Sequence, residues 1–364
     1  MKVVTLFGTR PEIIRLSAVI RVLDRFCTQV LVHTGQNYDP QLSDVFFRDL
    51  GVRAPDAHLG IGATGGFAEQ AAAIFEKSGE VLEREKPERV LILGDTTSGL
   101  AAIVAARLGI PVYHMEAGNR CYDDRVPEEI NRRVIDHSSS VLMPYTERSK
   151  DNLVREGIER ERIFVTGNPI YEVLMHYARQ IDASDALDRQ GVRERGYLLV
   201  TLHRAENVDE PQRLSRILNA LAAAGEEYRL PVLVSVHPRT AARMQQFALG
   251  GGGMRLLQPL GFFDFVRLEK SARAVLSDSG TVQEECAIFG VPNVTLRDVT
   301  ERAETIECGS NVLSGSAGDD IHRALCVALE TESHWMPPRE YVLPHVSRTV
   351  AKIVLGYTSI RRHM

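Results

Sequence analysis

Short runs of apolar and β-branched residues alternate with longer amphipathic stretches through the first half of the chain. The short runs predict strands at Val3–Phe7, Gln29–His33, Arg89–Leu93, Val112–Met115, Val141–Met143 and Ile163–Val165. Helical periodicity lies between several of them, as at Phe67–Glu85 and Ser98–Leu108. Strands that alternate with helices are typical of βαβ units, which build a parallel sheet.

The same alternation restarts in the second half. It predicts strands at Tyr197–Leu202, Val232–Val236, Arg255–Leu257, Ala274–Leu276 and Asn293–Leu296. A chain of 364 residues has room for two domains, since one domain usually takes about 100–200 residues. We predict an α/β fold with two Rossmann-like domains that face each other across a cleft. We place the N-terminal domain at residues 1–170, the C-terminal domain at 171–345, and a C-terminal helix that packs back on the N-terminal domain at 346–364.

Composition and charge narrow the class of protein. A formal net charge of -5 argues against nucleic acid as the main partner, because proteins that bind phosphate backbones usually carry a basic surface. No apolar run is long enough to cross a membrane and the N-terminus lacks the features of a signal peptide, so no membrane partner is expected. Five scattered cysteines without a C-x-x-C pair are typical of reduced thiols, and we expect a cytoplasmic protein.

Most predicted strands run directly into reactive or flexible residues: Gly8-Thr9-Arg10, Gly94-Asp95, Glu116-Ala117-Gly118, His203-Arg204, His237-Pro238 and Ser279-Gly280. In parallel α/β sheets ligands bind at the carboxyl ends of the strands, so these residues are expected to meet at a binding site. Each group alone is also explained as a turn at the end of a strand. Six consecutive occurrences weaken that explanation.

Three carboxylates stand out near strand ends, namely Asp95, Glu116 and Glu128. Partial burial and like-charge neighbours raise the pKa of such groups, which suits them to proton transfer at carbon. Glu128 has an alternative role in helix capping, because Pro127-Glu128-Glu129 has the features of a helix start. His203 is a candidate acid or hydrogen-bond donor to a leaving phosphate, with a structural histidine as the alternative.

A second group of residues suggests a phosphate site. Ser279, Gly280 and Thr281 open a predicted helix, and unpaired N–H groups at a helix N-terminus attract anions. The stretch Thr281–Glu284 also has the spacing of a capping box. Glu285 is placed to accept from ribose hydroxyls. Arginines hold diphosphate oxygens through paired hydrogen bonds, and the candidates are Arg10, Arg204, Arg302 and, less strongly, Arg15.

Other cofactor motifs are absent or out of place. Gly60–Gly65 matches G-x-G-x-x-G, but Asp56–Leu59 before it is not a convincing strand and the motif does not follow the first strand of its domain. The dinucleotide fingerprint requires both, so we interpret the segment as a loop that covers the cleft. No P-loop, H-E-x-x-H or paired Cys/His spacing occurs, and no cofactor or metal is expected.

Seven sequence motifs, taken in order, resemble the non-hydrolysing UDP-N-acetylglucosamine 2-epimerases. They are GTRPE at Gly8–Glu12, GDTTS at Gly94–Ser98, HMEAGNR at His114–Arg120, VPEEINR at Val126–Arg132, HRAEN at His203–Asn207, SDSGTVQEE at Ser277–Glu285 and TERAE at Thr300–Glu304. A single motif of this kind would be weak evidence. The ordered set, which spans both predicted domains, is highly specific.

The resemblance implies a glycosyltransferase-B type fold, a homodimer and a role in aminosugar biosynthesis. It implies reversible epimerisation of UDP-GlcNAc to UDP-ManNAc, by elimination of UDP to a 2-acetamidoglucal intermediate and re-addition. Asp95, Glu116 and Glu128 match the family's catalytic carboxylates, and His203 matches its active-site histidine. The positions that match UDP contacts are Arg10, Phe265, Ser279, Gly280, Glu285 and Arg302. A core aromatic is the alternative for Phe265.

The segment Gly35–Asp39 departs from the Gln-His-Arg segment of well-known bacterial members. That segment contributes to a second, activating substrate site, so activation by substrate is not expected here. This segment, GQNYD, and HMEAGNRC at His114–Cys121 also resemble relatives that act on UDP-linked 6-deoxy-L-hexosamines on the route to N-acetyl-L-fucosamine. Three further alternatives are a UDP-sugar glycosyltransferase, a hydrolysing epimerase and a non-enzymatic sugar-nucleotide sensor.

Overall fold

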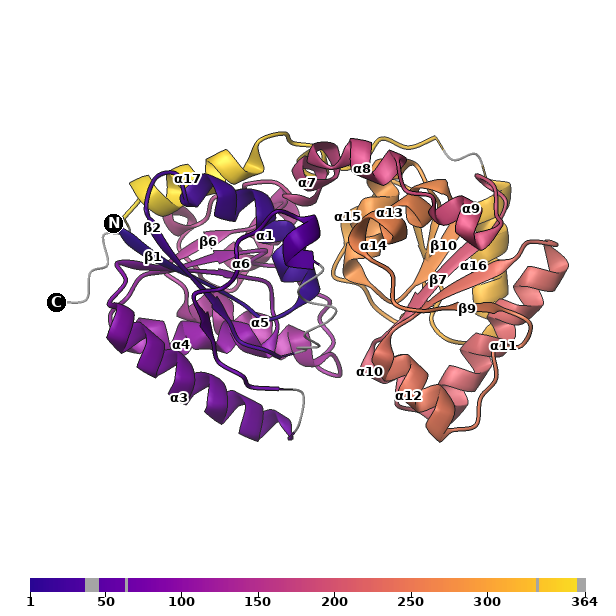
Figure 1. Ribbon diagram of the computed structural model, residues 1–364, viewed down its shortest axis with the longest axis horizontal. Coiled ribbons are helices and arrows are strands. Elements are labelled where there is room, and N and C mark those ends of the chain that lie inside the picture. Colours follow the sequence, from indigo (N-terminus) through magenta and orange to yellow (C-terminus); the bar gives the residue numbers. More distant parts are fainter. Residues whose placement is uncertain (37–45, 63–64, 332–333, 359–364) are drawn as a thin grey trace. The chain divides into compact units, whose positions relative to one another are not determined.

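The computed structural model describes residues 1–36, 46–62, 65–331 and 334–358. Its chain divides into two compact units (Figure 1). The first unit contains Met1–Met175 together with Glu340–Met364, and the second contains His176–Arg339. The chain therefore leaves the first unit once and returns to it at its C-terminal end.

The first unit is built on a six-stranded parallel sheet in the order β3-β2-β1-β4-β5-β6. The strands are β1 (Lys2–Phe7), β2 (Thr28–His33), β3 (Ala57–His58), β4 (Arg89–Leu93), β5 (Val112–Met115) and β6 (Val141–Met143). The predicted strand at Ile163–Val165 is wrong, because only Ile163 forms a single bridge, to Leu142. The judgement against a strand at Asp56–Leu59 was also wrong. There the Asp56 carboxylate accepts from the Leu31 N–H at 2.7 Å and helps to hold the short β3 at the sheet edge.

Helices cover both faces of this sheet (Figure 1). They are α1 (Arg10–Leu23), α3 (Phe67–Glu85), α4 (Ala101–Arg107), α5 (Pro127–Ser138), α6 (Glu147–Arg155), α7 (Ile170–His176) and α17 (Val346–Gly356), with short 3₁₀ turns at Thr97–Leu100, Arg160–Arg162 and Arg339–Tyr341. Val4, Val90 and Ile92 pack against Ile74 of α3 and Ala102 of α4 in one buried cluster. Because both faces are covered, β4 is buried along its whole length.

The C-terminal helix α17 packs beside α1 in the first unit (Figure 1). Arg89 of β4 donates to the Val354 carbonyl at the end of this helix, and to Thr358 Oγ1 at 2.9 Å. The Tyr113 hydroxyl of β5 donates to the Tyr357 carbonyl. Two sheet strands therefore fasten the C-terminal segment through its backbone.

The second unit repeats the architecture with a six-stranded parallel sheet in the order β12-β11-β10-β7-β8-β9. The strands are β7 (Leu198–Leu202), β8 (Val232–Val236), β9 (Arg255–Leu257), β10 (Ala274–Ser277), β11 (Asn293–Thr295) and β12 (Asn311–Leu313). Sequence analysis missed β12, whose first residue is polar. Buried Asn311 is accommodated because its amide donates to Gln283 and Thr305 at 3.1 Å each.

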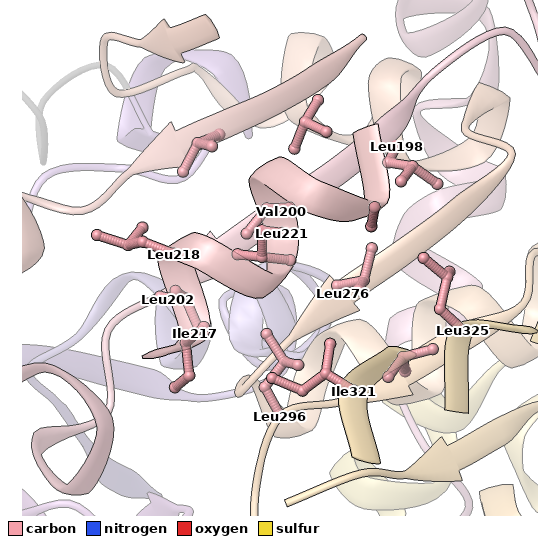
Figure 2. Close-up of a cluster of buried hydrophobic side chains, with 14 of the residues drawn as sticks. Leu198, Val200, Leu202, Ile217, Leu218, Leu221, Leu276, Leu296, Ile321 and Leu325 are labelled. Atoms are coloured by element: carbon pink, nitrogen blue, oxygen red, sulfur yellow. The ribbon is translucent and has the colours of Figure 1, made fainter. Parts of the chain in front are cut away.

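The helices of the second unit are α8 (Ala178–Asp182), α9 (Ala186–Gln190), α10 (Ala205–Val208), α11 (Pro211–Glu227), α12 (Pro238–Gln246), α13 (Phe262–Ser271), α14 (Gly280–Phe289), α15 (Ala303–Glu307) and α16 (Gly318–Glu330). Figure 2 shows Leu198 and Leu276 of the sheet facing Leu221 of α11 and Ile321 of α16. Two Rossmann-like parallel α/β units are present, as predicted. None of the helices in the described ranges combines the length and apolar character needed to span a membrane.

Candidate active site

Asp95 and Glu116 follow neighbouring strands, β4 and β5, at the same edge of the first sheet. Gly94 turns the chain with a φ of 80°, and a β-carbon on Gly94 would lie 4.0 Å from Oε2 of Glu116. Glu116 itself has a φ of 64°. Such a conformation is strained for a residue with a side chain and is often found at functional sites. The two carboxylate loops therefore lie next to each other, as the strand-end argument predicted.

The Glu116 carboxylate is held in a buried polar environment, with only 5% of the residue exposed. Oε2 accepts from Arg15 Nη1 at 3.1 Å and from the Tyr145 hydroxyl at 3.3 Å. The Arg15 guanidinium also lies over the Tyr145 ring, 5.9 Å from its centre. Arg15, which the sequence suggested as a weak diphosphate ligand, is placed here as the ionic partner of Glu116.

Asp95 has a different partner, Arg132 of α5. Oδ2 of Asp95 accepts from Nε of Arg132 at 3.0 Å and from Nη2 of the same side chain. The Asp95 carbonyl accepts from the Asn131 amide at 3.1 Å. Arg132 is 1% exposed, whereas the Asp95 side chain is 19% exposed. Asp95 is therefore oriented by a buried guanidinium while part of it stays accessible to a ligand. Sequence analysis listed Arg132 only as part of VPEEINR and assigned it no role.

Glu128 lies in the first turn of α5 and is half-buried. Its neighbour Glu129 is fully buried and accepts from the N–H groups of Cys121 at 3.0 Å and Tyr122 at 3.1 Å. Glu129 also pairs with Arg132 at 2.8 Å. The anchoring contacts at this end of α5 are therefore made by Glu129, and a catalytic role for Glu128 stays a prediction.

Glu12 is a buried carboxyl group that sequence analysis did not single out. Oε2 accepts from Gly8 N at 2.5 Å and Thr9 N at 3.0 Å, and Oε1 accepts from Thr96 Oγ1 at 2.7 Å. Burial raises the pKa of Glu12 to about 7, with a further contribution from the charge of Asp95 and against the opposing effect of these hydrogen bonds. Glu12 thus joins the loop after β1 to the loop after β4.

Replacing Glu12 with glutamine is expected to remove a pH dependence of stability. The pKa is raised from 4.5 to about 7 on folding, so the folded protein binds more protons in this window and its free energy of unfolding falls as pH rises through it. The fall amounts to about 3 kcal/mol at about 1.4 kcal/mol per pH unit. Urea unfolding from pH 4.5 to 7 should show that Glu12→Gln gains this much relative to the parent. A constant difference across the window would contradict the protonation assigned to Glu12.

A buried network of hydrogen bonds and ion pairs connects the loop that carries Asp95 with the loop that carries Glu116. His114 Nδ1 is 2.9 Å from Oδ1 of Asp136, and His114 Nε2 is 2.8 Å from the Gly94 carbonyl. Oδ2 of Asp136 accepts from Gly118 N at 3.2 Å and pairs with Arg120 at 2.8 Å. Although burial opposes it, hydrogen bonding and charge from His114 and Arg120 lower the pKa of Asp136. This ionised carboxylate fixes the backbone on either side of Asp95 and Glu116.

His203 and Asp278 come together in the second unit, at the ends of the paired strands β7 and β10. Nδ1 of His203 lies 3.0 Å from Oδ1 of Asp278. Asp278 was not named as a site residue by sequence analysis, although it lies within SDSGTVQEE. The signal that could find Asp278 is its position directly after a buried strand, which it shares with Glu116.

The start of α14 has the close approach expected of an anion site. Ser279 is the N-cap residue, and its hydroxyl lies 3.0 Å from that of Thr281. A β-carbon on Gly280 would meet Glu301 Oε1 at 2.7 Å and Arg302 Nη2 at 3.6 Å. The predicted Thr281–Glu284 capping box is wrong, because Ser279 occupies the cap position and Glu284 pairs with Arg302.

Two candidate cations of the second unit gather around Glu301, which is 6% exposed. Nη2 of Arg204 and Nη1 of Arg302 each lie 3.7 Å from Glu301 Oε1, and Arg297 Nη1 lies 2.8 Å from Oε2. Guanidinium groups held in this way are oriented in advance for paired hydrogen bonds to phosphate. Glu301 and Arg297 were missed because nothing in their local sequence predicts this cluster.

The remaining predicted residues are placed as follows. Glu285 lies in α14 and is 6% exposed; its charge, after burial, helps to raise the pKa of neighbouring Glu269. Phe265 of α13 is only partly buried and packs against a core cluster of the second unit, a placement compatible with both roles considered for it. Arg10 is the first residue of α1 in the first unit, with its guanidinium 5.7 Å from the Phe46 ring centre. The predicted residues thus form two groups, one in each unit.

The glycine-rich segment Gly60–Gly65 follows β3 at the sheet edge, not β1. Residues 63–64 lie outside the described part of the chain, as do Asn37, Tyr38 and Asp39 of the segment that bears on substrate activation. Gln36 is described, and its Oε1 accepts from the Ser98 N–H at 3.2 Å and hydroxyl at 3.1 Å. Within the described residues, no group of three or more His, Cys, Asp or Glu side chains has the arrangement of a metal site.

Two parallel α/β units of the glycosyltransferase-B type, with strand-end carboxylates in one and an arginine-flanked helix N-terminus in the other, define an enzyme of the nucleotide-sugar class. The family model described as UDP-N-acetylglucosamine 2-epimerase matches residues 23–355. The chain belongs to the UDP-N-acetylglucosamine 2-epimerase family, as the sequence motifs predicted.

Individual relatives support this assignment. The UDP-N-acetylglucosamine 2-epimerase of Methanocaldococcus jannaschii is 40% identical over 350 residues, which are 93% of this chain and 95% of the relative. The UDP-2,3-diacetamido-2,3-dideoxy-D-glucuronate 2-epimerase of Pseudomonas aeruginosa is 38% identical over 330 residues, 88% of this chain and 90% of the relative. The crystal structure of the M. jannaschii enzyme with UDP-GlcNAc and UDP superposes with a TM-score of 0.93, at 38% identity, over 98% of this chain and 99% of that one.

Proposed function

We propose that this enzyme interconverts UDP-GlcNAc and UDP-ManNAc by elimination of UDP and re-addition to a 2-acetamidoglucal intermediate. The observation that carries the proposal is the pair of strand-end carboxylates, Asp95 and Glu116, each held by its own buried arginine. Inversion at C2 requires removal of a proton from one face of the sugar and delivery to the other. Two separately oriented carboxylates are suited to such a pair of proton transfers.

The second unit supplies the charge that the departing nucleotide needs. When the C1–O bond breaks, its electron pair stays on a β-phosphate oxygen. Arg204 and Arg302, together with the first turn of α14 at Gly280, present guanidinium and N–H groups that stabilise such an anion. The proposed UDP-binding group also includes His203, Ser279, Thr281 and Glu285. Phe265 is proposed to lie near the uracil, and Arg10 of the first unit is a further proposed UDP contact. Elimination and re-addition move a proton and the nucleotide but no hydride, so the proposed steps need no nicotinamide cofactor.

The proposal is tested by proton NMR of the purified protein with UDP-GlcNAc in D₂O, without added metal or NAD. A UDP-ManNAc signal with deuterium at C2 is the expected result, because the proton removed from C2 exchanges with solvent before it returns. Accumulation of free ManNAc and UDP would indicate a hydrolysing epimerase instead. Absence of both C2 exchange and a new sugar would contradict the proposal.

One finding favours a second substrate. The P. aeruginosa relative, named for a diacetamido-dideoxy-glucuronate, is nearly as similar to this chain as the M. jannaschii enzyme. The same NMR experiment with UDP-2,3-diacetamido-2,3-dideoxy-D-glucuronate discriminates the two sugars. If C2 exchange occurs with that compound and not with UDP-GlcNAc, that compound is the substrate. A UDP-linked 6-deoxy-L-hexosamine is the third compound in the series.

A further inference from the structure

The pair formed by His203 and Asp278 has one buried end and one accessible end. The Asp278 side chain is 0% exposed, whereas 34% of the His203 side chain is exposed. The ring centres of His203 and His237 lie 5.7 Å apart, so a second imidazole lies beside His203. A ligand can therefore reach His203 but cannot reach the carboxylate behind it.

Three donors besides the imidazole fix the Asp278 carboxylate. The His203 N–H lies 3.1 Å from each oxygen, the Arg204 N–H lies 3.0 Å from Oδ2, and the Asn207 amide lies 3.1 Å from Oδ2. Asn207 is itself held by the Leu296 carbonyl at 2.8 Å and by Arg213 Nε at 2.8 Å. The carboxylate thus has little freedom to rotate.

Asp278 is ionised at neutral pH. Burial alone would raise its pKa, but the charge of His203 and the hydrogen bonds from His203, Arg204 and Asn207 outweigh burial and lower the pKa to about 2. An ionised carboxylate only accepts hydrogen bonds, so Nδ1 of His203 must carry the proton between them. Among the described residues Nε2 of His203 has no hydrogen-bond partner. The ring therefore presents Nε2 on its accessible side.

We propose that Asp278 is a positioning residue for catalysis, which holds His203 so that a protonated Nε2 donates to a β-phosphate oxygen of the departing nucleotide. This inference rests on the proposed epimerisation. In the elimination the C1–O electron pair stays on that oxygen, the C2 proton passes to a carboxylate of the first unit, and the C2–H electrons form the C1=C2 double bond. The Nε2–H group donates a hydrogen bond throughout and is not consumed, and re-addition reverses each change.

The carboxylate contributes to this step through charge as well as orientation. With both ring nitrogens protonated, the imidazolium offers a charge-assisted hydrogen bond to phosphate, which is stronger than a neutral one. The same arrangement, with a buried Asp behind the Nδ1–H of a catalytic histidine, operates in serine proteases. Asparagine at 278 would keep the shape but remove the charge. Its amide would donate to Nδ1, so the neutral ring would carry its proton on Nε2 and offer only an uncharged hydrogen bond to phosphate.

A purely structural role for Asp278 is the competing explanation, because its carboxylate also fastens the start of α10 to the end of β10. A double-mutant cycle with His203 separates the two roles. Asp278→Asn in the full chain should lower kcat for C2 exchange by about 10-fold, the difference between a charge-assisted and a neutral hydrogen bond, with KM changed far less. In a His203→Ala background the same substitution should have almost no further effect on kcat. Equal losses in both backgrounds would overturn the proposal, and Asp320→Asn, exposed in α16, is the matched control.

A second measurement is made on the parent protein and does not depend on turnover. In the ¹⁵N-histidine-labelled parent protein at neutral pH, the ¹⁵N shifts of His203 should report a protonated Nδ1, with the signal assigned by its loss in His203→Ala. Addition of UDP should shift the Nε2 resonance, since the ligand contacts that atom. An unprotonated Nδ1, or no Nε2 response to bound UDP, would overturn the role of Asp278. Absence of C2 exchange in the parent, with both NMR results as expected, would overturn the epimerisation instead.

Discussion

Glu116→Gln is expected to reduce turnover about 10³-fold or more while UDP binding is retained. A glutamine cannot accept the C2 proton, and a positioned general base supplies about 10²–10⁴-fold. The proposed UDP contacts at Arg204, Gly280 and Arg302 all belong to the second unit, whereas Glu116 belongs to the first. Calorimetric titration with UDP checks that binding is retained. C2 exchange, measured in the same preparation, checks the loss of turnover.

The Glu116→Gln variant leaves the buried Arg15 guanidinium without its negatively charged partner. Breaking a buried ion pair from one side costs about 3–5 kcal/mol, so a fall in thermal stability of the first unit is expected as well. Asp95→Asn provides an independent case with a different partner, Arg132. Asp124→Asn, whose side chain is 71% exposed, is the control and should be fully active. Normal turnover in both Glu116→Gln and Asp95→Asn would remove the carboxylates from the mechanism.

The strands most reliably predicted from sequence are those whose signal is local. Arg89–Leu93 and Val232–Val236 each have four apolar residues out of five, and they form β4 and β8 with the predicted bounds. The edge strands β3, with two residues, and β12, with three, were missed, although the equally short β6 and β9 were predicted. Their pairing depends on neighbours distant in sequence, as when the Asp56 carboxylate binds the backbone of β2. The apolar run at Ile163 was taken for a strand although it makes only one bridge.

The candidate site shows the same difference between residues that a local sequence signal identifies and residues that only tertiary contacts reveal. Asp95, Glu116 and His203 were identified because each follows an apolar run, and the carboxyl end of a parallel strand is where ligands bind. Arg132, Glu12, Asp278 and Glu301 were not assigned roles, because their importance arises from tertiary contacts. Arg132, for example, lies 37 positions from the Asp95 that it orients. No spacing rule in the sequence encodes such a pair.

Arg302→Ala is expected to weaken UDP binding by about 10- to 100-fold, which corresponds to the loss of one or two charge-assisted hydrogen bonds. Arg302 is 3% exposed, lies beside the first turn of α14, and shares Glu301 with Arg204. Its removal is therefore expected to reduce the positive charge available to the diphosphate. Calorimetric titration with UDP measures the effect, and Arg323→Ala, a 72% exposed arginine of α16, is the control.

Arg302 is also the partner of Glu284, which is 0% exposed. Its loss leaves a buried carboxylate without its guanidinium, so the single variant is expected to lose stability as well as affinity. The double variant Arg302→Ala/Glu284→Gln separates these effects, because it removes the unpaired charge. Thermal stability should largely recover in the double variant, whereas UDP affinity should stay low. Recovery of UDP affinity together with stability would show that Arg302 supports the fold of the second unit and does not contact the nucleotide.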